Sequence, residues 1–228
     1  MIEGLDGSGK STQVSILKRF LHTAQIPFKQ IKLPDYDDPS STLVQMYLAG
    51  KFGENPGDVN AYAASSFYAV DRYASFKQHW QTDYQNGTLI LADRYTSSNA
   101  VHQASKLPQQ EWDAYLDWLY DYEFRLLGIP KPNKVIFLDM PPSISQKLMS
   151  HRYQGDEKQK DIHERDVDYL EHCRAAALYA AQKLNWDVVQ CFCEDEPLAI
   201  ETIAKQIESL IKPLLFENDF EKGTEIKK

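Results

Sequence analysis

Residues 4–11 read Gly4-Leu-Asp-Gly-Ser-Gly9-Lys10-Ser11 and match the pattern G-x-x-x-x-G-K-[ST] at every fixed position. The glycines let the backbone turn so that successive N–H groups face one concavity, and a helix starting near Ser11 adds its positive dipole end. Lys10 can then contact the β- and γ-phosphates of a nucleotide, while the Ser11 hydroxyl can bind Mg²⁺. The residues expected at the phosphates are Gly4, Asp6, Gly7, Ser8, Gly9, Lys10, Ser11 and Thr12.

Short apolar runs alternate with helical patterns along the chain. Residues 88–92 and 135–138 are continuous apolar runs, which indicate strands buried on both faces. Met1-Ile2 supplies only the end of a first strand, which is short for a central strand. Further strands are expected at residues 28–33 and 188–189, and helices at 11–24, 41–48, 58–84 (capped by Asp58), 109–127, 142–151, 164–183 and 197–215. This alternation predicts an α/β protein: a three-layer α/β/α P-loop NTPase fold with a parallel five-stranded central sheet.

The 228 residues suit one domain, expected over residues 1–216. Within it, the polar segment around residues 151–163 is expected to form a lid, and the charged residues 217–228 are expected to fray. The net charge is −8 without a basic cluster, so a nucleic-acid partner is not expected. There is also no apolar run of about 18–20 residues and no signal peptide at the start, so we expect a cytoplasmic protein without a membrane partner.

The phosphate loop alone does not decide among GTPases, motor ATPases and small-molecule kinases. A GTPase needs a guanine-reading Asn-Lys-x-Asp, but the match at Asn133-Lys134 lacks the aspartate and precedes a buried strand. Small kinases instead place a second substrate over the sheet. The carboxyl ends of the predicted strands, where ligands bind in such sheets, are therefore the place to look for an acceptor site.

Several segments beyond the loop resemble the thymidylate kinase family. Residues 3–13, Glu-Gly-Leu-Asp-Gly-Ser-Gly-Lys-Ser-Thr-Gln, are similar to the family's E-G-x-D-G-x-G-K-[ST]-T-Q opening. Asp93-Arg94-Tyr95 resembles its D-R-[YH] motif. Further likenesses are Pro34-Asp35-Tyr36, the Phe67–Arg72 segment, Ser98-Asn99 with His102-Gln103, and Ile162-His163-Glu164-Arg165-Asp166. The likeness runs from residue 3 to about residue 200 in the family's order.

This resemblance implies ATP-dependent phosphorylation of dTMP to dTDP in dTTP biosynthesis, with Mg²⁺, in a homodimer that uses helices near the base-binding helix. Another P-loop nucleoside-monophosphate or deoxynucleoside kinase, and a nucleotide-binding module without turnover, remain open alternatives. The three classes differ in whether a phosphoryl group reaches an acceptor, and which one.

The phosphotransfer residues follow from the charge that two anionic substrates bring together. Lys10 and Arg94 are expected to neutralise the phosphates, since a guanidinium at a strand's carboxyl end can bind a phosphate bidentately. Asp93 ends a buried strand and, with Ser11 and Asp6, is a candidate for holding Mg²⁺. The family resemblance also associates Asp6 with the acceptor's 3′-hydroxyl.

The lid is expected to supply one more cation. Gly7 and Ser8 leave no arginine in the phosphate loop, and relatives of this kind carry the cation in the lid instead. Arg152, Lys158 and Lys160 are the candidates. Arg152 is preferred because it adjoins a helix end and stays charged at any relevant pH.

The base site is expected on the helix that carries Tyr68 and Arg72, which share one face because they are four residues apart. The ring can stack on a nucleobase, while the guanidinium can donate to the base's carbonyl oxygen. Asn99 can read the N3–H and O4 edge of thymine. By resemblance, the other substrate contacts are Asp6, Tyr36, Arg94, Ser98, His102 and Gln103, with His102 standing where the family more often has tyrosine.

Overall fold

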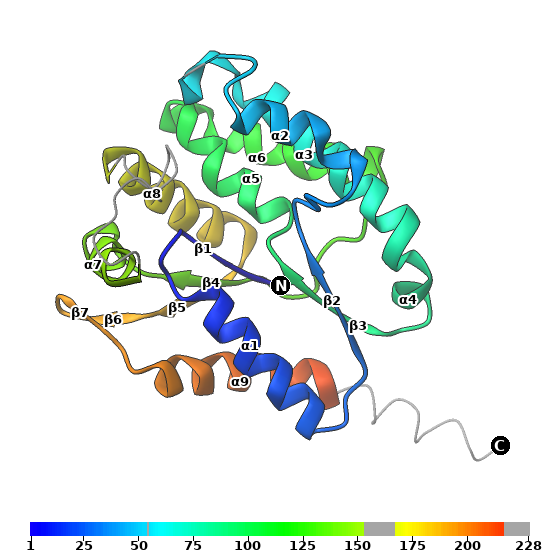
Figure 1. Ribbon diagram of the computed structural model, residues 1–228, viewed down its shortest axis with the longest axis vertical. Coiled ribbons are helices and arrows are strands. Elements are labelled where there is room, and N and C mark those ends of the chain that lie inside the picture. Colours follow the sequence, from blue (N-terminus) through cyan, green and yellow to red (C-terminus); the bar gives the residue numbers. More distant parts are fainter. Residues whose placement is uncertain (54, 153–166, 217–228) are drawn as a thin grey trace.

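The computed structural model describes residues 1–53, 55–152 and 167–216, and these residues build a five-stranded parallel sheet in the order β2-β3-β1-β4-β5 (Figure 1). The strands are β1 (Ile2–Gly4), β2 (Phe28–Lys32), β3 (Leu89–Asp93), β4 (Ile136–Asp139) and β5 (Asp187–Gln190). The predicted sheet is confirmed. As expected, β1 is short, and it pairs with β3 only through Ile2 and Asp93.

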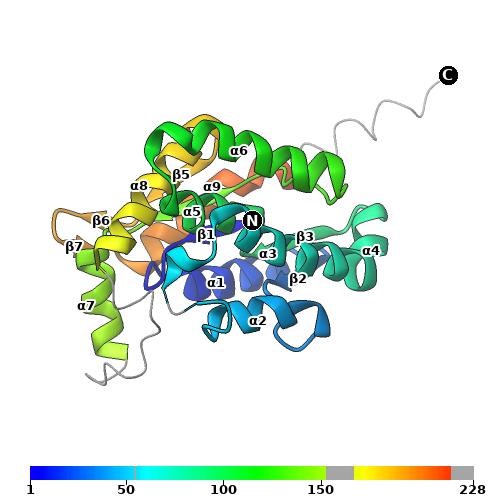
Figure 2. The same cartoon turned by 90° about the horizontal axis from the view of Figure 1, so that it is seen from above.

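Helices cover both faces of the sheet and make the three predicted layers. They are α1 (Lys10–Thr23), α2 (Thr42–Leu48), α3 (Ala61–Ser75), α4 (Gln81–Gln85), α5 (Thr96–His102), α6 (Trp112–Tyr120), α7 (Pro142–Arg152), α8 (Val167–Leu184) and α9 (Ile200–Phe216). One face carries α1 and α9, and the other carries α5, α6 and α8, with α2 and α3 beyond α5 (Figure 1). Figures 1 and 2 both place α7 at one end of the molecule and α4 at the other. No helix of the described part of the chain is long and apolar enough to span a bilayer.

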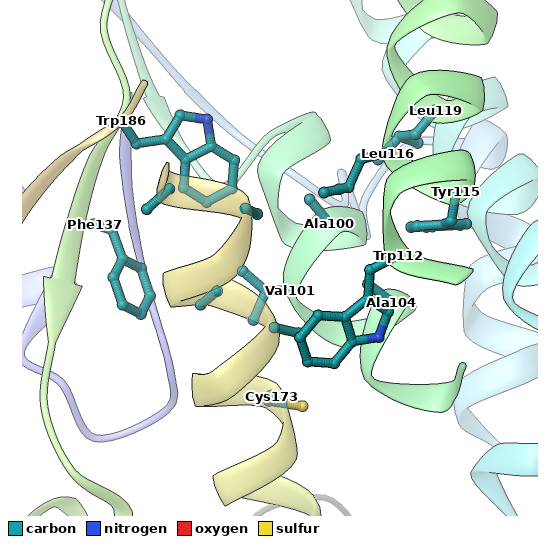
Figure 3. Close-up of a cluster of buried hydrophobic side chains, with 14 of the residues drawn as sticks. Ala100, Val101, Ala104, Trp112, Tyr115, Leu116, Leu119, Phe137, Cys173 and Trp186 are labelled. Atoms are coloured by element: carbon teal, nitrogen blue, oxygen red, sulfur yellow. The ribbon is translucent and has the colours of Figure 1, made fainter. Parts of the chain in front are cut away.

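Strand β4 shows why the apolar runs of the sequence are continuous. Successive side chains of a strand face opposite sides of a sheet, and both sides here are covered. Phe137 packs on α5, α6 and α8, in a cluster with Val101 and Trp112 (Figure 3). Its neighbours Ile136 and Leu138 enter the second cluster, beneath α1 and α9. Every position of the strand is therefore apolar until Asp139 reaches the edge of the sheet.

The start of α3 corrects one prediction. Asp58 was expected to cap this helix, but the helix begins at Ala61 and the Asn60 side chain accepts a hydrogen bond from the Ala63 amide. Asp58 instead accepts from the Asn55 amide at 2.9 Å and closes a separate short turn. Both residues are good helix caps, so the local sequence did not decide between them.

Three expected helices also differ in the structure. The helix expected over residues 58–84 consists of α3 and α4 with a π-helical turn, Phe76–Trp80, between them. Helix α9 begins at Ile200 rather than at 197, because Glu196–Pro197 (β7) pairs antiparallel with Phe192–Cys193 (β6). The segment expected as one helix over residues 109–127 contains α6 followed by a π-helical turn, Asp121–Leu126. Helix α5, which directly follows the Asp93-Arg94-Tyr95 motif, was not predicted.

Candidate active site

The phosphate loop connects β1 to α1 at the carboxyl edge of the sheet. Gly9 precedes the helix with φ of 87°, a left-handed conformation that favours glycine. It offers no side-chain cap, and the first turn of α1 holds no acidic residue. The first N–H groups of α1 therefore remain available to an anion, and the helix dipole adds to their attraction.

Lys10 is folded back onto this loop. Its Nζ donates to the backbone carbonyls of Gly4 at 2.5 Å and Leu5 at 3.0 Å, and lies 3.8 Å from an oxygen of Asp6. Burial, with the nearby charge of Arg94, lowers the pKa of Lys10 to about 8. Asp6, Glu3 and Asp93 only partly offset this effect, and a phosphate bound beside the ammonium would add further negative charge.

Arg94 leaves the end of β3 in a left-handed conformation, with φ of 66°. Its Nη2 donates to Asp6 at 2.6 Å, and its Nη1 lies 3.7 Å from Glu3. Burial opposes the charge, but Asp6, Glu3 and Asp93 outweigh it and raise the pKa of Arg94. A non-glycine residue at positive φ is strained, and such strain often occurs at functional sites where the surroundings fix the backbone.

Glu3 is a fully buried carboxylate behind Arg94, and its function was not anticipated from the sequence. It accepts hydrogen bonds from the Gly4 amide at 2.9 Å, Ser97 Oγ at 2.8 Å and Ser98 Oγ at 2.6 Å. Burial alone would raise its pKa, but Arg94, Lys10 and these donors lower it. In the sequence, only its position as the first residue of the motif 3–13 indicated that Glu3 belongs to the site.

Two cavities meet at Arg94. The larger, about 700 Å³, is lined by the phosphate loop, the end of β3, Leu148 and Met149 of α7, and residues 197–201. Lys10 lines this cavity. The three expected Mg²⁺ ligands, Ser11, Asp93 and Asp6, line it too.

The smaller cavity, about 260 Å³, is lined by all nine residues expected to bind the acceptor, namely Asp6, Tyr36, Tyr68, Arg72, Arg94, Ser98, Asn99, His102 and Gln103. These residues come from the phosphate loop, the segments after β2 and β3, helices α3 and α5, and the residue that follows α5. The sequence reasoning missed Tyr47 and Tyr169, which also line this cavity. Asp6, Tyr36 and Arg94 line both cavities.

Arg72 is tied down by a residue that the sequence reasoning did not identify. Its Nε and Nη2 each donate to Glu123 at 2.6 Å, and both side chains are almost fully buried. Within the described part of the chain, Nη1 makes one long contact, 3.4 Å, with the Tyr95 carbonyl. The available signal was an isolated carboxylate within the apolar, aromatic face of residues 112–126.

Aromatic rings form the walls of the smaller cavity near α2 and α3. The Tyr68 ring lies edge-on to Tyr47, with 6.4 Å between centroids, and burial raises the pKa of Tyr68. Tyr36, on the other side, is 51% exposed. The segment that carries Tyr36 is anchored by buried Asp71, which accepts from the Asp35 amide at 3.1 Å and Ser40 Oγ at 2.7 Å.

His102 contacts Arg94 from α5. An arginine only donates hydrogen bonds, so His102 Nε2, 3.2 Å from Arg94 Nη1, must accept. The ring proton then sits on Nδ1, which faces Cys173 Sγ at 3.7 Å. Burial and the Arg94 charge lower the pKa of His102 to about 4, so the ring is neutral at pH 7.

The donors around the phosphate loop fit Mg²⁺ chemistry. The described residues contain no group of three or more His, Cys, Asp or Glu side chains placed to hold a metal. Mg²⁺ needs fewer protein ligands than that, because substrate phosphates and water complete its shell. Ser11 and Asp93, with Asp6, supply hard oxygen donors on the wall of the larger cavity.

The cations expected in the lid are at the end of α7 and in the segment that follows it in sequence. Helix α7 ends at Arg152, whose side chain lies outside the described residues, as do Lys158, Lys160 and residues 153–166 as a whole. The expected tail, residues 217–228, also lies outside them. The roles assigned to these residues stay predictions.

The sheet order, the phosphate loop and a second polar cavity beside it define a P-loop protein with room for a nucleotide and an acceptor. A family model described as thymidylate kinase matches residues 2–196. The chain therefore belongs to the thymidylate kinase family.

Individual relatives agree with the family match. The chain is 29% identical over 181 residues to a thymidylate kinase of Mycobacterium tuberculosis, covering 78% of this chain and 82% of the relative. It is 26% identical over 214 residues to a probable thymidylate kinase of Pyrobaculum aerophilum, covering 92% and 96%. A Dictyostelium discoideum thymidylate kinase is 29% identical over 166 residues, covering 71% and 68%.

The buried neutral His102 predicts a pH dependence of stability. The ordinary histidine pKa of 6.5 applies to the unfolded chain, against about 4 in the folded protein. Between these values the unfolded chain binds more protons, so this group makes the free energy of unfolding fall as pH is lowered. Urea unfolding at several pH values measures this free energy. Between the two pKa values it should depend less on pH in His102→Gln than in the unaltered protein, whereas the control His22→Gln, at an exposed histidine, should behave like the unaltered protein. Equal slopes for all three proteins would contradict the assignment.

Proposed function

We propose that the chain is an ATP:dTMP phosphotransferase that makes dTDP on the route to dTTP. The observation that carries the proposal is the position of Arg94, which lines both cavities at once. An acceptor phosphate in the smaller cavity and the γ-phosphate of ATP in the larger one would both reach its guanidinium. The family match and the relatives' names give no support to the alternative kinases or to a non-catalytic module.

The chemistry joins two anions that repel each other. An oxygen of the dTMP phosphate attacks the γ-phosphorus of ATP, the bond to the β-bridging oxygen breaks, and ADP leaves. In this proposal Arg94 exchanges its contact with Asp6 for the acceptor phosphate, and Lys10 exchanges the Gly4 and Leu5 carbonyls for the β- and γ-phosphates. Both cations then act where negative charge develops.

The Ser11 hydroxyl and Asp93, directly or through water, would hold Mg²⁺, which would supply positive charge against the phosphates. Asp6 would turn from Arg94 toward the acceptor's 3′-hydroxyl and the metal. From the lid, Arg152 is the proposed additional cation. The adenine would lie against the apolar wall of the larger cavity at Met149, Pro197 and Leu198.

The thymine would occupy the inner part of the smaller cavity. Tyr68 offers its ring for stacking, and Arg72 Nη1 faces the base's O4. Asn99 would accept from thymine N3–H. Gln103 is a further candidate, because its buried Oε1 has no hydrogen-bond partner among the described residues.

A panel of acceptors tests the proposed activity. ADP release should depend on dTMP and be several-fold lower, per enzyme, with dUMP, dCMP, thymidine or AMP at equal concentration with ATP and Mg²⁺. Turnover with thymidine alone would instead indicate a nucleoside kinase. ATP binding without transfer to any acceptor would indicate a non-catalytic module and would contradict the proposal.

Removal of the shared guanidinium gives a second prediction. Arg94→Ala should lower kcat on the order of 10²-fold, because the lost charge acts mainly in the transition state. Steady-state kinetics with saturating ATP and dTMP measure the effect. The control is Arg125→Ala, which removes an exposed arginine paired with Asp121 and should leave kcat unchanged. An Arg94→Ala enzyme with normal kcat would remove Arg94 from the mechanism.

A homodimer is proposed through α3 and its neighbours. Exposed apolar side chains follow this surface, namely Leu43 and Met46 on α2, Tyr62, Val70 and Tyr73 on α3, and Tyr84 on α4. Multi-angle light scattering should give a mass twice the 26.3 kDa of one chain, and the Val70→Asp variant should have the mass of a single chain. A single-chain mass for the unaltered protein would contradict the dimer. The cytoplasmic location expected from the sequence stays a prediction.

A further inference from the structure

Glu123 lies beneath the proposed base site without lining the cavity. It sits in the π-helical turn Asp121–Leu126, directly after α6, and its side chain is fully buried. A π-helical turn shifts the following side chains around the helix axis relative to a regular helix, and such turns frequently occur at functional sites. An unpaired carboxylate buried here would strongly destabilise the fold. The hydrogen-bond partners of Glu123 therefore make its burial possible.

Each partner of Glu123 also belongs to the wall of the base site or adjoins it. Arg72 donates from Nε and Nη2, both at 2.6 Å, and Thr96 Oγ1 donates at 2.8 Å. The Asn99 amide nitrogen lies 3.5 Å from Glu123 Oε1 and 3.2 Å from the Ser65 carbonyl. A single carboxylate therefore contacts both residues proposed to read the base edge, Arg72 and Asn99.

These contacts fix which groups remain for a ligand. The two neighbours of the Asn99 amide nitrogen are both acceptors, so the –NH₂ end must face them and the Oδ1 end faces away. Glu123 likewise occupies two of the three guanidinium nitrogens of Arg72, which leaves Nη1 with its long contact, 3.4 Å, to the Tyr95 carbonyl. Of these two side chains, Asn99 thus keeps an acceptor, Oδ1, for a ligand, and Arg72 keeps a donor, Nη1.

We infer that Glu123 is a positioning residue that makes this site select pyrimidines with an N3–H and a 4-oxo group over pyrimidines with a 4-amino group. Thymine offers a donor at N3 and an acceptor at O4, which complement Asn99 Oδ1 and Arg72 Nη1. Cytosine offers the reverse, an acceptor at N3 and a donor at N4. Binding cytosine would require the Asn99 amide to turn, which would place its oxygen against the Glu123 carboxylate. This inference rests on the proposed function and deepens it.

The isosteric substitution Glu123→Gln tests the inference. A glutamine amide keeps the shape but removes the charge and one acceptor, so Arg72 and Asn99 lose their fixed orientation. The KM for dTMP should rise roughly 10-fold with kcat within about 2-fold, while the inhibition constant of dCMP against dTMP stays within about 2-fold. Selectivity for the 4-oxo base therefore falls roughly 10-fold, while the KM for ATP is unchanged.

A matched control separates positioning from general stability. Asp139→Asn weakens a comparable bidentate carboxylate–arginine pair, with Arg174 at 2.7 and 3.0 Å, that does not line the base cavity. Both variants should unfold at lower urea concentration than the unaltered protein, but only Glu123→Gln should lose selectivity. Loss of stability with unchanged selectivity in Glu123→Gln would overturn the inference.

A milder variant covers the case in which Glu123→Gln does not fold. Thr96→Val removes one hydroxyl that donates to Glu123 and should lower the same selectivity a few-fold. Unchanged selectivity in this variant would also contradict the inference. If the unaltered protein shows no dTMP-dependent turnover, the proposed function fails first. If it does turn over dTMP and the variants keep their selectivity, only the role of Glu123 fails.

Discussion

The contact between Arg94 and its carboxylates is the interaction on which the site depends. Asp6 holds one end of the guanidinium at 2.6 Å, and the buried Glu3 lies 3.7 Å from the other. Glu3 is in turn fixed by Ser97 and Ser98 at the start of α5. Since Arg94 lines both cavities, this arrangement fixes its guanidinium where the proposed acceptor and donor phosphates would meet.

Buried charge explains how the site can be both stable and reactive. A buried ion is tolerated only when it is paired or hydrogen-bonded. Here Arg94 pairs with Asp6, and Lys10 donates to two loop carbonyls. Phosphate oxygens are stronger partners for both cations. In the proposed function, substrate phosphates replace these internal contacts without leaving a buried charge unpaired.

The sequence predicted those parts of the fold and site that depend on local chemistry. The loop at residues 4–11 connects β1 to α1 and both continuous apolar runs form strands, as predicted, because glycine spacing and apolar runs are local signals. Glu123 was not predicted as a site residue because its role depends on an ion pair with Arg72, which is 51 residues away in the sequence. Asn60 and Asp58 are equally good caps, and the β6–β7 pairing depends on a hairpin that shortens α9.

The central claim is that Arg94 and Lys10 exchange their internal partners for two adjacent phosphates. A crystal structure with a bisubstrate analogue, in which thymidine and adenosine are joined through a chain of phosphates, tests it most directly. The account predicts thymine beside Arg72 and Asn99, Arg94 on a phosphate oxygen instead of Asp6, and Lys10 released from the Gly4 and Leu5 carbonyls. A complex in which Arg94 keeps its contact with Asp6 and the phosphate chain bypasses it would contradict the account.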